Sequence, residues 1–353
     1  MRAWLFGLLA LTGCATLSTD LDRSALLAKA QLAQARAPRR RAPQAWPFES
    51  YAQLERRTRP FPSFQPVIRP LARHRRALSG LVQEELRFLS RVQLQQPESN
   101  VAIAYLYRHG PLGERPVVVF APGLYVSQTA MTPVGWLLDR VLEAGADVLF
   151  FVPPYHLGRT PRGWDSGDAV LAAELPDHLG VIAQGVADLR QLCAWLRAQG
   201  VPALGGFGGS MGASMLLQVA RMDRSLDFFT GLIPLVRWDD LFLGPPEFQP
   251  LRELVVEQGH DPRRLVALYA ELDPAAVAPT IPPERVSLLV AEYDQVARSG
   301  PLSQWRQAWG LTRVRSYPRG HATILLTPDL YRDYSTFLAE DLAAMVRGGS
   351  SSQ

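Results

Sequence analysis

From about residue 90, the hydrophobic positions fall into short continuous runs separated by longer segments with a helical period. The runs have the length and composition of strands, and they lie at 101–109, 117–120, 147–154, 201–208, 227–235, 285–294 and 312–318. The helical patterns lie at 131–145, 177–199, 213–222, 301–309 and 328–346. Strands that alternate with helices of this length predict an α/β fold, in which a mostly parallel central sheet carries helices on both faces.

One long interruption of this alternation defines a candidate lid. Residues 236–284 separate two predicted strands and contain short helical patterns, and an insertion of this size at a sheet edge is often functional. Its apolar residues, Trp238 and 241–243, indicate an apolar substrate portion, although a lid packed as core would show the same pattern. The predicted domain covers 86–347, and a flexible tail is expected at 348–353.

The N-terminus has the pattern of an export signal. Arg2 supplies a short positive region, and the apolar run 3–11 is too short to span a bilayer, which takes about 20 apolar residues. The run ends in Leu-Thr-Gly-Cys, which resembles the bacterial lipobox. That resemblance implies a lipoprotein signal peptide at 1–13, acyl chains on Cys14, and an exported protein anchored to a membrane in the periplasm or cell envelope. The alternative is an ordinary cleaved signal with a chance cysteine.

Residues 14–85 are predicted to form a tether and an N-terminal arm laid over the domain, with a helical stretch near 21–36. The chain has 37 Lys and Arg against 33 Asp and Glu, which gives a formal charge of +4. Lys29 is the sole lysine, and arginines concentrate at 36–43 and 69–76, before the domain. This distribution favours a solvated or membrane-facing arm, so no nucleic-acid partner is expected.

The two cysteines limit the chemistry that the chain can perform. Cys14 belongs to the N-terminal motif, and Cys193 lies on the apolar side of a predicted helix. Two cysteines exclude a cysteine metal site, and Cys193 without a partner forms no intramolecular disulfide. Cys193 is therefore expected to be buried as a small hydrophobic side chain. Neither a metal nor an organic cofactor is expected.

A glycine-rich stretch, GGFGGSMGAS at 205–214, places one hydroxyl between a predicted strand and a predicted helix. Gly208, Ser210 and Gly212 form the G-x-S-x-G pattern, in which the serine occupies a strained turn and the glycines avoid collisions with the neighbouring strand and helix. Such a turn exposes the serine hydroxyl above the sheet. Phosphate binding is the alternative for a glycine-rich turn, but no Gly-Lys-Ser/Thr follows.

A serine hydroxyl needs a base, and the base needs an orienting acid. In this architecture the expected chain order is serine, then a carboxylate after a strand, then a histidine after the last strand. Asp294 ends the strand predicted at 285–294, and His321 follows the strand at 312–318. Both lie where open α/β sheets bind ligands. The alternative acids are Glu292 and Asp273, and the alternative for His321 is a loop histidine without a catalytic role. His260, His178 and His156 lie outside the expected loop.

Negative charge that develops on a carbonyl oxygen during attack needs hydrogen-bond donors. One expected donor is the backbone N–H of Met211, directly after the serine. The second is expected from the loop after the strand at 117–120, where Ala-Pro-Gly precedes Leu124. The alternative interpretation of that loop is a simple proline–glycine turn.

With these motifs in this order, residues 100–345 resemble the α/β-hydrolase superfamily of serine hydrolases. This resemblance implies the α/β-hydrolase fold. The loop at 151–163 is similar to the Pro-Tyr-x-Gly-Arg loop of the alpha/beta hydrolase domain-containing-protein-18 type, although the lid and the N-terminal arm depart from that type. This second resemblance implies that Tyr155, His156 and Arg159 line the pocket and contact an acyl or phosphate group. A purely structural loop is the alternative.

The expected function is hydrolysis of a carboxylic ester with an apolar or lipid-like portion through an acyl-enzyme, in which Ser210 attacks, His321 transfers the proton and Asp294 orients the imidazole. A peptidase or an acyltransferase would use the same residues. A non-catalytic surface lipoprotein that retains the fold is the alternative from another class.

Overall fold

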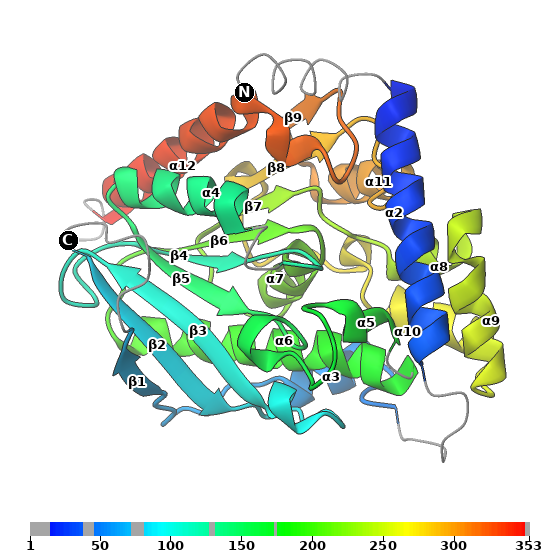
Figure 1. The fold of residues 1–353 in the computed structure, drawn as a ribbon. Coiled ribbons are helices and arrows are strands. Elements are labelled where there is room, and N and C mark those ends of the chain that lie inside the picture. The colour runs from blue at the N-terminus through cyan, green and yellow to red at the C-terminus, as the bar shows by residue number, and fades with distance from the viewer. Residues whose placement is uncertain (1–14, 38–45, 72–80, 127–130, 173–174, 350–353) are drawn as a thin grey trace.

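The computed structural model describes residues 15–37, 46–71, 81–126, 131–172 and 175–349. Within these residues the central feature is a nine-stranded sheet with the order β1-β2-β3-β5-β4-β6-β7-β8-β9 (Figure 1). The strands are β1 (Val67–Pro70), β2 (Val82–Leu89), β3 (Val101–Arg108), β4 (Val117–Ala121), β5 (Asp147–Val152), β6 (Leu204–Gly209), β7 (Phe228–Leu232), β8 (Val286–Ala291) and β9 (Arg313–Tyr317).

The sheet is antiparallel at one end and parallel through the rest. The pairs β1–β2, β2–β3 and β3–β5 are antiparallel, whereas every pair from β5 through β4, β6, β7 and β8 to β9 is parallel. Every residue of β4, β5, β7 and β8 is buried, as continuous apolar runs covered on both faces should be. The prediction of a mostly parallel α/β sheet is therefore confirmed.

Helices cover both faces of this sheet. One apolar core includes α4 (Met131–Glu143) and α12 (Pro328–Gly349). The opposite core includes α6 (Leu175–Ala198), α7 (Ser210–Met222) and α11 (Ser299–Trp309). The candidate lid at 236–284 contains α8 (Trp238–Leu243), α9 (Gln249–Glu257) and α10 (Pro262–Ala270). The shorter helices α3 (Tyr51–Arg57) and α5 (Asp168–Ala172) complete the cover of the α6 side.

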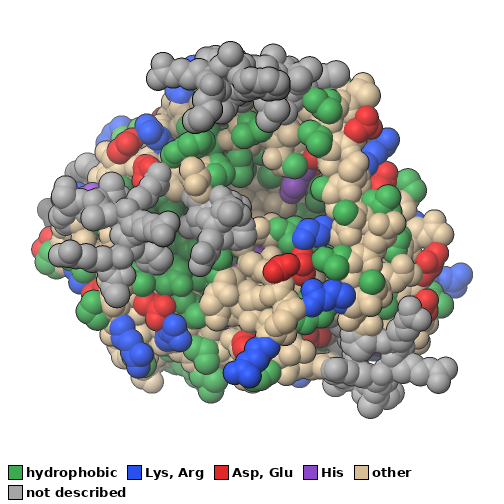
Figure 2. Space-filling model, viewed as in Figure 1, with side chains coloured by type: hydrophobic (Ala, Val, Ile, Leu, Met, Phe, Trp, Pro, Cys, Tyr) green, Lys and Arg blue, Asp and Glu red, His purple; other side chains and the backbone are tan. Residues whose placement is uncertain are grey.

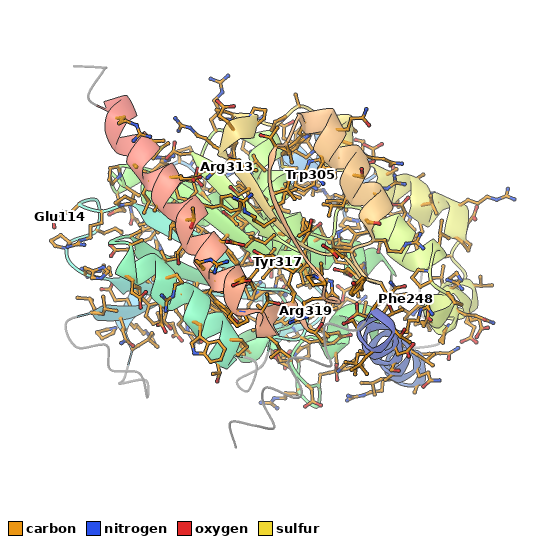
Figure 3. All side chains as sticks on the ribbon, turned by 90° about the horizontal axis from the view of Figure 1, so that it is seen from above. Glu114, Phe248, Trp305, Arg313, Tyr317 and Arg319 are labelled. Carbon is orange, nitrogen blue, oxygen red and sulfur yellow. The ribbon has the colours of Figure 1, made fainter. Side chains whose placement is uncertain are left out.

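The N-terminal segment contributes regular structure to this domain. Helix α2 (Ala15–Arg36) packs against α5, α9 and the short turn η3 (Pro246–Phe248). Its buried residues include Ser18, Asp22, Ala30 and Ala33, which share one helix face and are small or short enough for close approach. Figure 1 shows α2 on the side towards which the parallel strands point, and Figure 3 shows it end-on beside Phe248.

The predicted boundary between arm and domain differs from the structure. Residue 86 lies inside β2, and β1, which belongs to the segment predicted as tether and arm, extends the sheet by pairing with β2. Sequence alone does not indicate this pairing, because the exposed strand β1 (Val67–Pro70) has no continuous apolar run. Residues 1–14 and 350–353, which carry the predicted signal and the end of the predicted tail, lie outside the described residues.

Candidate active site

Ser210 occupies a strained turn between β6 and α7. Its φ is +46°, in the left-handed region that side chains rarely adopt. A Cβ on Gly212 would come closer than 3.0 Å to the carbonyl oxygens of Ala121 and Pro122, and one on Gly208 would collide with the backbone of Ala213. The glycines of the G-x-S-x-G pattern therefore let α7 approach β4 and β6 closely enough to form this turn.

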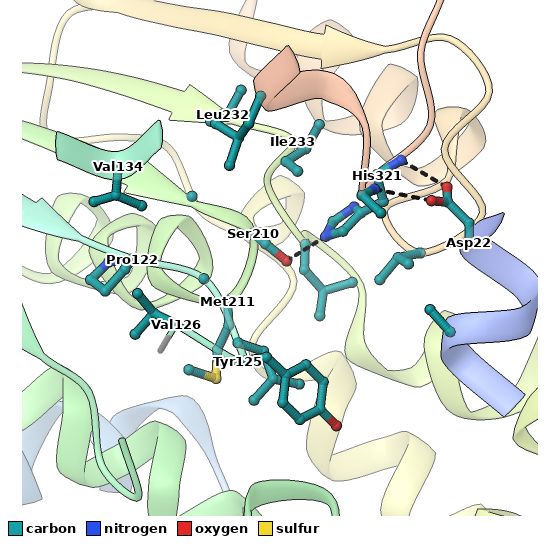
Figure 4. A pocket seen from close by; sticks show the side chains of 18 of the residues that line it. Asp22, Pro122, Tyr125, Val126, Val134, Ser210, Met211, Leu232, Ile233 and His321 are labelled. Atoms are coloured by element: carbon teal, nitrogen blue, oxygen red, sulfur yellow. Dashed lines mark hydrogen bonds between the residues drawn. The ribbon is translucent and has the colours of Figure 1, made fainter. Parts of the chain in front are cut away.

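The structure brings His321 and Asp294 to the serine. The Nε2 atom of His321 lies 2.9 Å from Ser210 Oγ, and Nδ1 lies 2.8 Å from Asp294 Oδ2 (Figure 4 draws the serine contact). The second oxygen of Asp294 accepts the backbone N–H groups of Val296 and Ala297, both at 2.8 Å. These two bonds fix the carboxylate, so it orients the imidazole with Nε2 towards the hydroxyl.

The alternative acids, and the histidines outside the expected loop, lie elsewhere. Glu292 is exposed, and Asp273 pairs with Arg237 and caps a 3₁₀ turn. His178 is buried against the Tyr269 hydroxyl of α10, and the ring of His260 packs at a tilted angle against that of Trp46. Asp294 and His321 are thus the acid and the imidazole that lie beside the Ser210 hydroxyl.

Opposing effects set the pKa of His321. Burial lowers this pKa, but the attraction and hydrogen bond of Asp294, together with the attraction of Asp22, outweigh burial and raise it above the ordinary histidine value. Asp22 comes from α2, and its carboxylate accepts the backbone N–H groups of His321 and Ala322 (Figure 4). Asp22 is not among the residues predicted from the sequence, because no local motif marks it.

The two residues that are expected to supply the oxyanion donors lie at the same cavity as Ser210. Leu124 and Met211 both line it. Met211 is the second residue of α7, where a backbone N–H has no intrahelical acceptor. Gly123 allows the Leu124 loop to approach, because a Cβ there would already touch the Cβ of Ser210 at 3.2 Å. Both backbone segments thus lie next to Ser210.

His156 holds the loop that carries Leu124. Its Nε2 atom accepts the backbone N–H of Tyr125 at 3.1 Å, and Nδ1 donates to the carbonyl oxygen of Pro154 at 2.8 Å. Burial lowers the pKa of His156 to about 4, so the imidazole is neutral near pH 7 and can accept that bond. Tyr125 itself has a φ of +66°, and the bond fixes this unusual conformation.

The structure does not place Tyr155, His156 and Arg159 at the cavity, as the loop resemblance had implied. All three side chains are fully buried and absent from its lining. Arg159 pairs with Asp188 at 2.9 Å and binds carbonyl oxygens of the neighbouring segments, and Tyr155 donates its hydroxyl to Asp177. These polar groups are paired inside the domain rather than with a ligand, so the loop has a structural role.

The cavity beside Ser210 has a volume of about 600 Å³ and a mostly apolar wall. The wall comes from several elements, with Leu26 from α2, Val134 and Leu137 from α4, and Trp238 and Phe248 from the lid segment. Figure 2 shows a hollow in this face with a histidine inside it and hydrophobic side chains around it. The arrangement can hold an apolar group with its reactive end at the serine.

Two charged residues of α2 line this cavity, and both have partners. Asp22 binds the backbone N–H groups of the loop that carries His321. The Lys29 ammonium pairs with Asp168 of α5 at 2.6 Å and lies 4.2 Å from the centre of the Tyr125 ring. The single lysine of the sequence therefore links α2 to α5 and to the loop after β4.

The remaining sequence features concern the two cysteines, metal binding and membrane-spanning helices. Cys14 lies outside the described residues, whereas Cys193 is buried and unpaired, and burial raises the pKa of its thiol to about 12. In the described parts of the chain, no three His, Cys, Asp or Glu side chains are grouped to hold a metal ion. No helix among the described residues has the length and apolar character needed to cross a membrane.

Neither a protein-family model nor a curated protein matches this sequence. Solved structures do match its architecture. Acetyl xylan esterase 1 from Thermoanaerobacterium sp. JW/SL YS485 superposes with a TM-score of 0.56 at 14% identity, over 82% of this chain and 92% of its own. The fold is that of the α/β-hydrolases.

Two further structures agree with this assignment of the α/β-hydrolase fold. A cold-adapted esterase from an Arctic intertidal metagenomic library has a TM-score of 0.50 at 15% identity, over 77% of this chain and 98% of that chain. A prolyl endopeptidase has a TM-score of 0.51 at 14% identity, over 75% of this chain and 39% of its own. At such low identity the likeness establishes the fold, and the chemistry has to be argued from the site.

Proposed function

We propose that the protein is a serine hydrolase that cleaves carboxylic esters with an apolar acyl or lipid-like portion. The observation that carries the proposal is the hydrogen-bonded series Ser210–His321–Asp294, with 2.9 Å and 2.8 Å between the bonded atoms. A serine in a strained turn, an imidazole at its hydroxyl and a buried carboxylate behind the imidazole are the parts that nucleophilic acyl transfer requires.

The proposed reaction begins when His321 Nε2 removes the proton of Ser210 as its Oγ attacks the ester carbonyl. The backbone N–H groups of Leu124 and Met211 donate to the oxyanion. When the tetrahedral intermediate collapses, the carbon–oxygen bond to the alcohol breaks, and the alcohol takes the proton from His321. Water then repeats the sequence on the acyl-enzyme, releasing the acid and restoring the serine. Asp294 stays ionised and stabilises the imidazolium.

The apolar wall of the cavity supports the choice of substrate class. The polar groups that reach it are mostly committed to protein partners, which leaves apolar contacts as the main source of binding for a substrate chain. Burying one methylene of such a chain contributes about 0.8 kcal/mol, so esters of longer acyl chains should bind more tightly. A cavity of about 600 Å³ has room for a medium acyl chain.

We also propose that the mature protein is an exported lipoprotein anchored through Cys14. The support is the Leu-Thr-Gly-Cys sequence after a short apolar run. Because α2 starts at Ala15 and lines the cavity, such an anchor would hold the cavity close to a membrane. Cys14→Ala should move the protein from the membrane fraction to the soluble fraction of cells, and unchanged membrane association would contradict the anchor.

The catalytic proposal is tested with purified protein and p-nitrophenyl esters from acetate to palmitate. Ser210→Ala should lower hydrolysis by a factor on the order of 10³ or more, while its melting temperature stays close to wild type. Ser303→Ala is the matched control, since it removes the hydroxyl of an exposed serine on α11 and should keep the wild-type rate. An inactive wild type, or an active Ser210→Ala, would refute the proposal. Cleavage of p-nitroanilides in preference to esters would assign a peptidase instead.

A further inference from the structure

The carboxylate of Asp22 joins α2 to both loops that carry the partners of Ser210. Its Oδ2 atom accepts the N–H of His321 at 2.7 Å and that of Gln295 at 3.2 Å, and its Oδ1 atom accepts the N–H of Ala322 at 3.0 Å. His321 and Ala322 belong to the loop after β9, whereas Gln295 directly follows Asp294 in the loop after β8. One side chain therefore bridges the histidine loop and the acid loop.

The contact between α2 and the histidine loop is unusually close. Asp22 has 1% of its surface exposed. A Cβ on Gly320 would lie 2.8 Å from Asp22 Oδ2 and 2.9 Å from the carbonyl oxygen of Ser18. Real Cβ atoms hardly ever approach other atoms this closely, so only glycine fits at position 320. The loop sequence is thus adapted to a helix about 300 residues earlier in the chain, as the separation between Asp22 and Ala322 shows.

Asp22 also adds a second negative charge beside the imidazole. Among the residues that the structure describes, the charged groups that act on His321 are Asp294, from the loop after β8, and Asp22, from α2. The three cations of α2 are directed elsewhere. Lys29 pairs with Asp168 on α5, Arg23 pairs with Glu247 on η3, and the Arg36 guanidinium lies over the ring of Trp164. The negative charge of Asp22 favours the protonated imidazole and contributes to the raised pKa of His321.

We propose that Asp22 is a positioning residue for the reaction, and that α2 is an integral part of the active site rather than an arm beside it. This inference rests on the proposed function. Through the three N–H bonds, Asp22 fixes the backbone of His321 and the segment next to Asp294, so that the imidazole meets Ser210 Oγ. Its charge additionally stabilises the imidazolium that forms during attack.

Asp22→Asn tests this proposal with the full-length protein. The amide has the same shape but carries no charge and offers one acceptor oxygen to the three N–H groups. We expect kcat for p-nitrophenyl acetate to fall by about 10- to 100-fold, as a small misplacement of the histidine should cause. KM should change little, because a two-carbon acyl group does not extend along α2. The acidic limb of kcat/KM against pH should move to lower pH, because a negative charge that raised the pKa of His321 is lost.

Three further variants make the result specific. Asp20→Asn removes the same charge from an exposed position on the same helix and should leave kcat and the acidic limb at their wild-type values. Asp22→Glu restores the charge and should return the acidic limb towards wild type, even where kcat recovers only in part. Gly320→Ala keeps the Asp22 side chain and its charge, but its methyl group collides with Asp22 and with the Ser18 carbonyl oxygen and pushes the loop away from α2, so it should reproduce the loss of kcat.

The outcomes separate this inference from the function on which it rests. If the wild type hydrolyses esters and folded Asp22→Asn keeps both the wild-type kcat and the wild-type acidic limb, Asp22 has no positioning role and the proposed function stands. The inference is also overturned if Asp22→Asn lowers kcat without moving the acidic limb and Asp20→Asn lowers kcat by the same factor. If the wild type neither hydrolyses esters nor reacts with a fluorophosphonate at Ser210, the proposed function fails first and the inference fails with it.

Discussion

Gly212 offers a sharp test of how the backbone builds this site. It lies two residues after Ser210, where α7 passes the end of β4. In Gly212→Ala, the new Cβ would come closer than 3.0 Å to the carbonyl oxygens of Ala121 and Pro122. An ordinary carbon–oxygen contact needs about 3.3 Å, so α7 and the loop after β4 must separate by roughly 1 Å.

Two separate losses follow from this displacement. Forcing a methyl group into a packed interior costs about 1–3 kcal/mol of the free energy of unfolding. The displaced loop carries Leu124, and the displaced helix begins next to Met211, so the two proposed oxyanion donors move apart. Losing one such donor lowers kcat by about 10²- to 10³-fold, and a shift of roughly 1 Å should cost up to about 100-fold.

The assay compares kcat for p-nitrophenyl acetate with urea unfolding of the same preparations. Gly300→Ala is the control, because no atom lies within 4 Å of the place that its new methyl group would take and its φ is not positive. Gly300 lies in α11, so this change should leave kcat unaltered and stabilise the fold by about 0.4–1 kcal/mol. A folded Gly212→Ala with the kcat of wild type would refute the argument that close approach of α7 and β4 creates the oxyanion site.

Three further predictions concern the histidine and its surroundings. Asp294→Asn should lower kcat on the order of 10³- to 10⁴-fold in stopped-flow acylation, and a loss below about 10-fold would assign orientation of the imidazole to another group. Activity requires neutral His321, and Asp294 and Asp22 raise the pKa of this imidazole. The value of kcat/KM should therefore rise with pH through a midpoint above the ordinary histidine value of 6.5. A midpoint below 6.5 would show that burial outweighs the two carboxylates. His156→Ala frees the Tyr125 N–H and should lower kcat about 10-fold with little change in KM, whereas unchanged kcat would show that the loop holds its shape without it.

The sequence predicts the strand-to-helix turn and its partners because these features are local. The glycines around Ser210 are needed by a turn that is built from adjacent residues. Asp294 and His321 each follow a recognisable strand, and the carboxyl ends of parallel strands share one edge of the sheet. Chain order then brings the three residues together without any knowledge of the packing between helices.

Long-range packing explains what the sequence does not reveal. In the sequence, nothing distinguishes Asp22 from the other carboxylates of a polar helix. Its role depends on the loop near residue 320, which packs against α2 and donates backbone N–H groups to Asp22. Arg159 shows the opposite case. A short motif suggests a ligand contact, but Asp188 of α6 meets the guanidinium inside the domain and removes it from the cavity. Neither outcome follows from periodicity or spacing within one segment.

The central claim is that Ser210 is a nucleophile, and covalent labelling measures that directly. The wild type is incubated with a fluorophosphonate at about pH 8, digested, and analysed by mass spectrometry. We predict one added phosphonyl group, located on the peptide that contains Ser210, with a labelling rate at least about 100-fold lower in His321→Ala. A folded wild type that remains unlabelled, or that carries the label on another residue, would contradict the central claim.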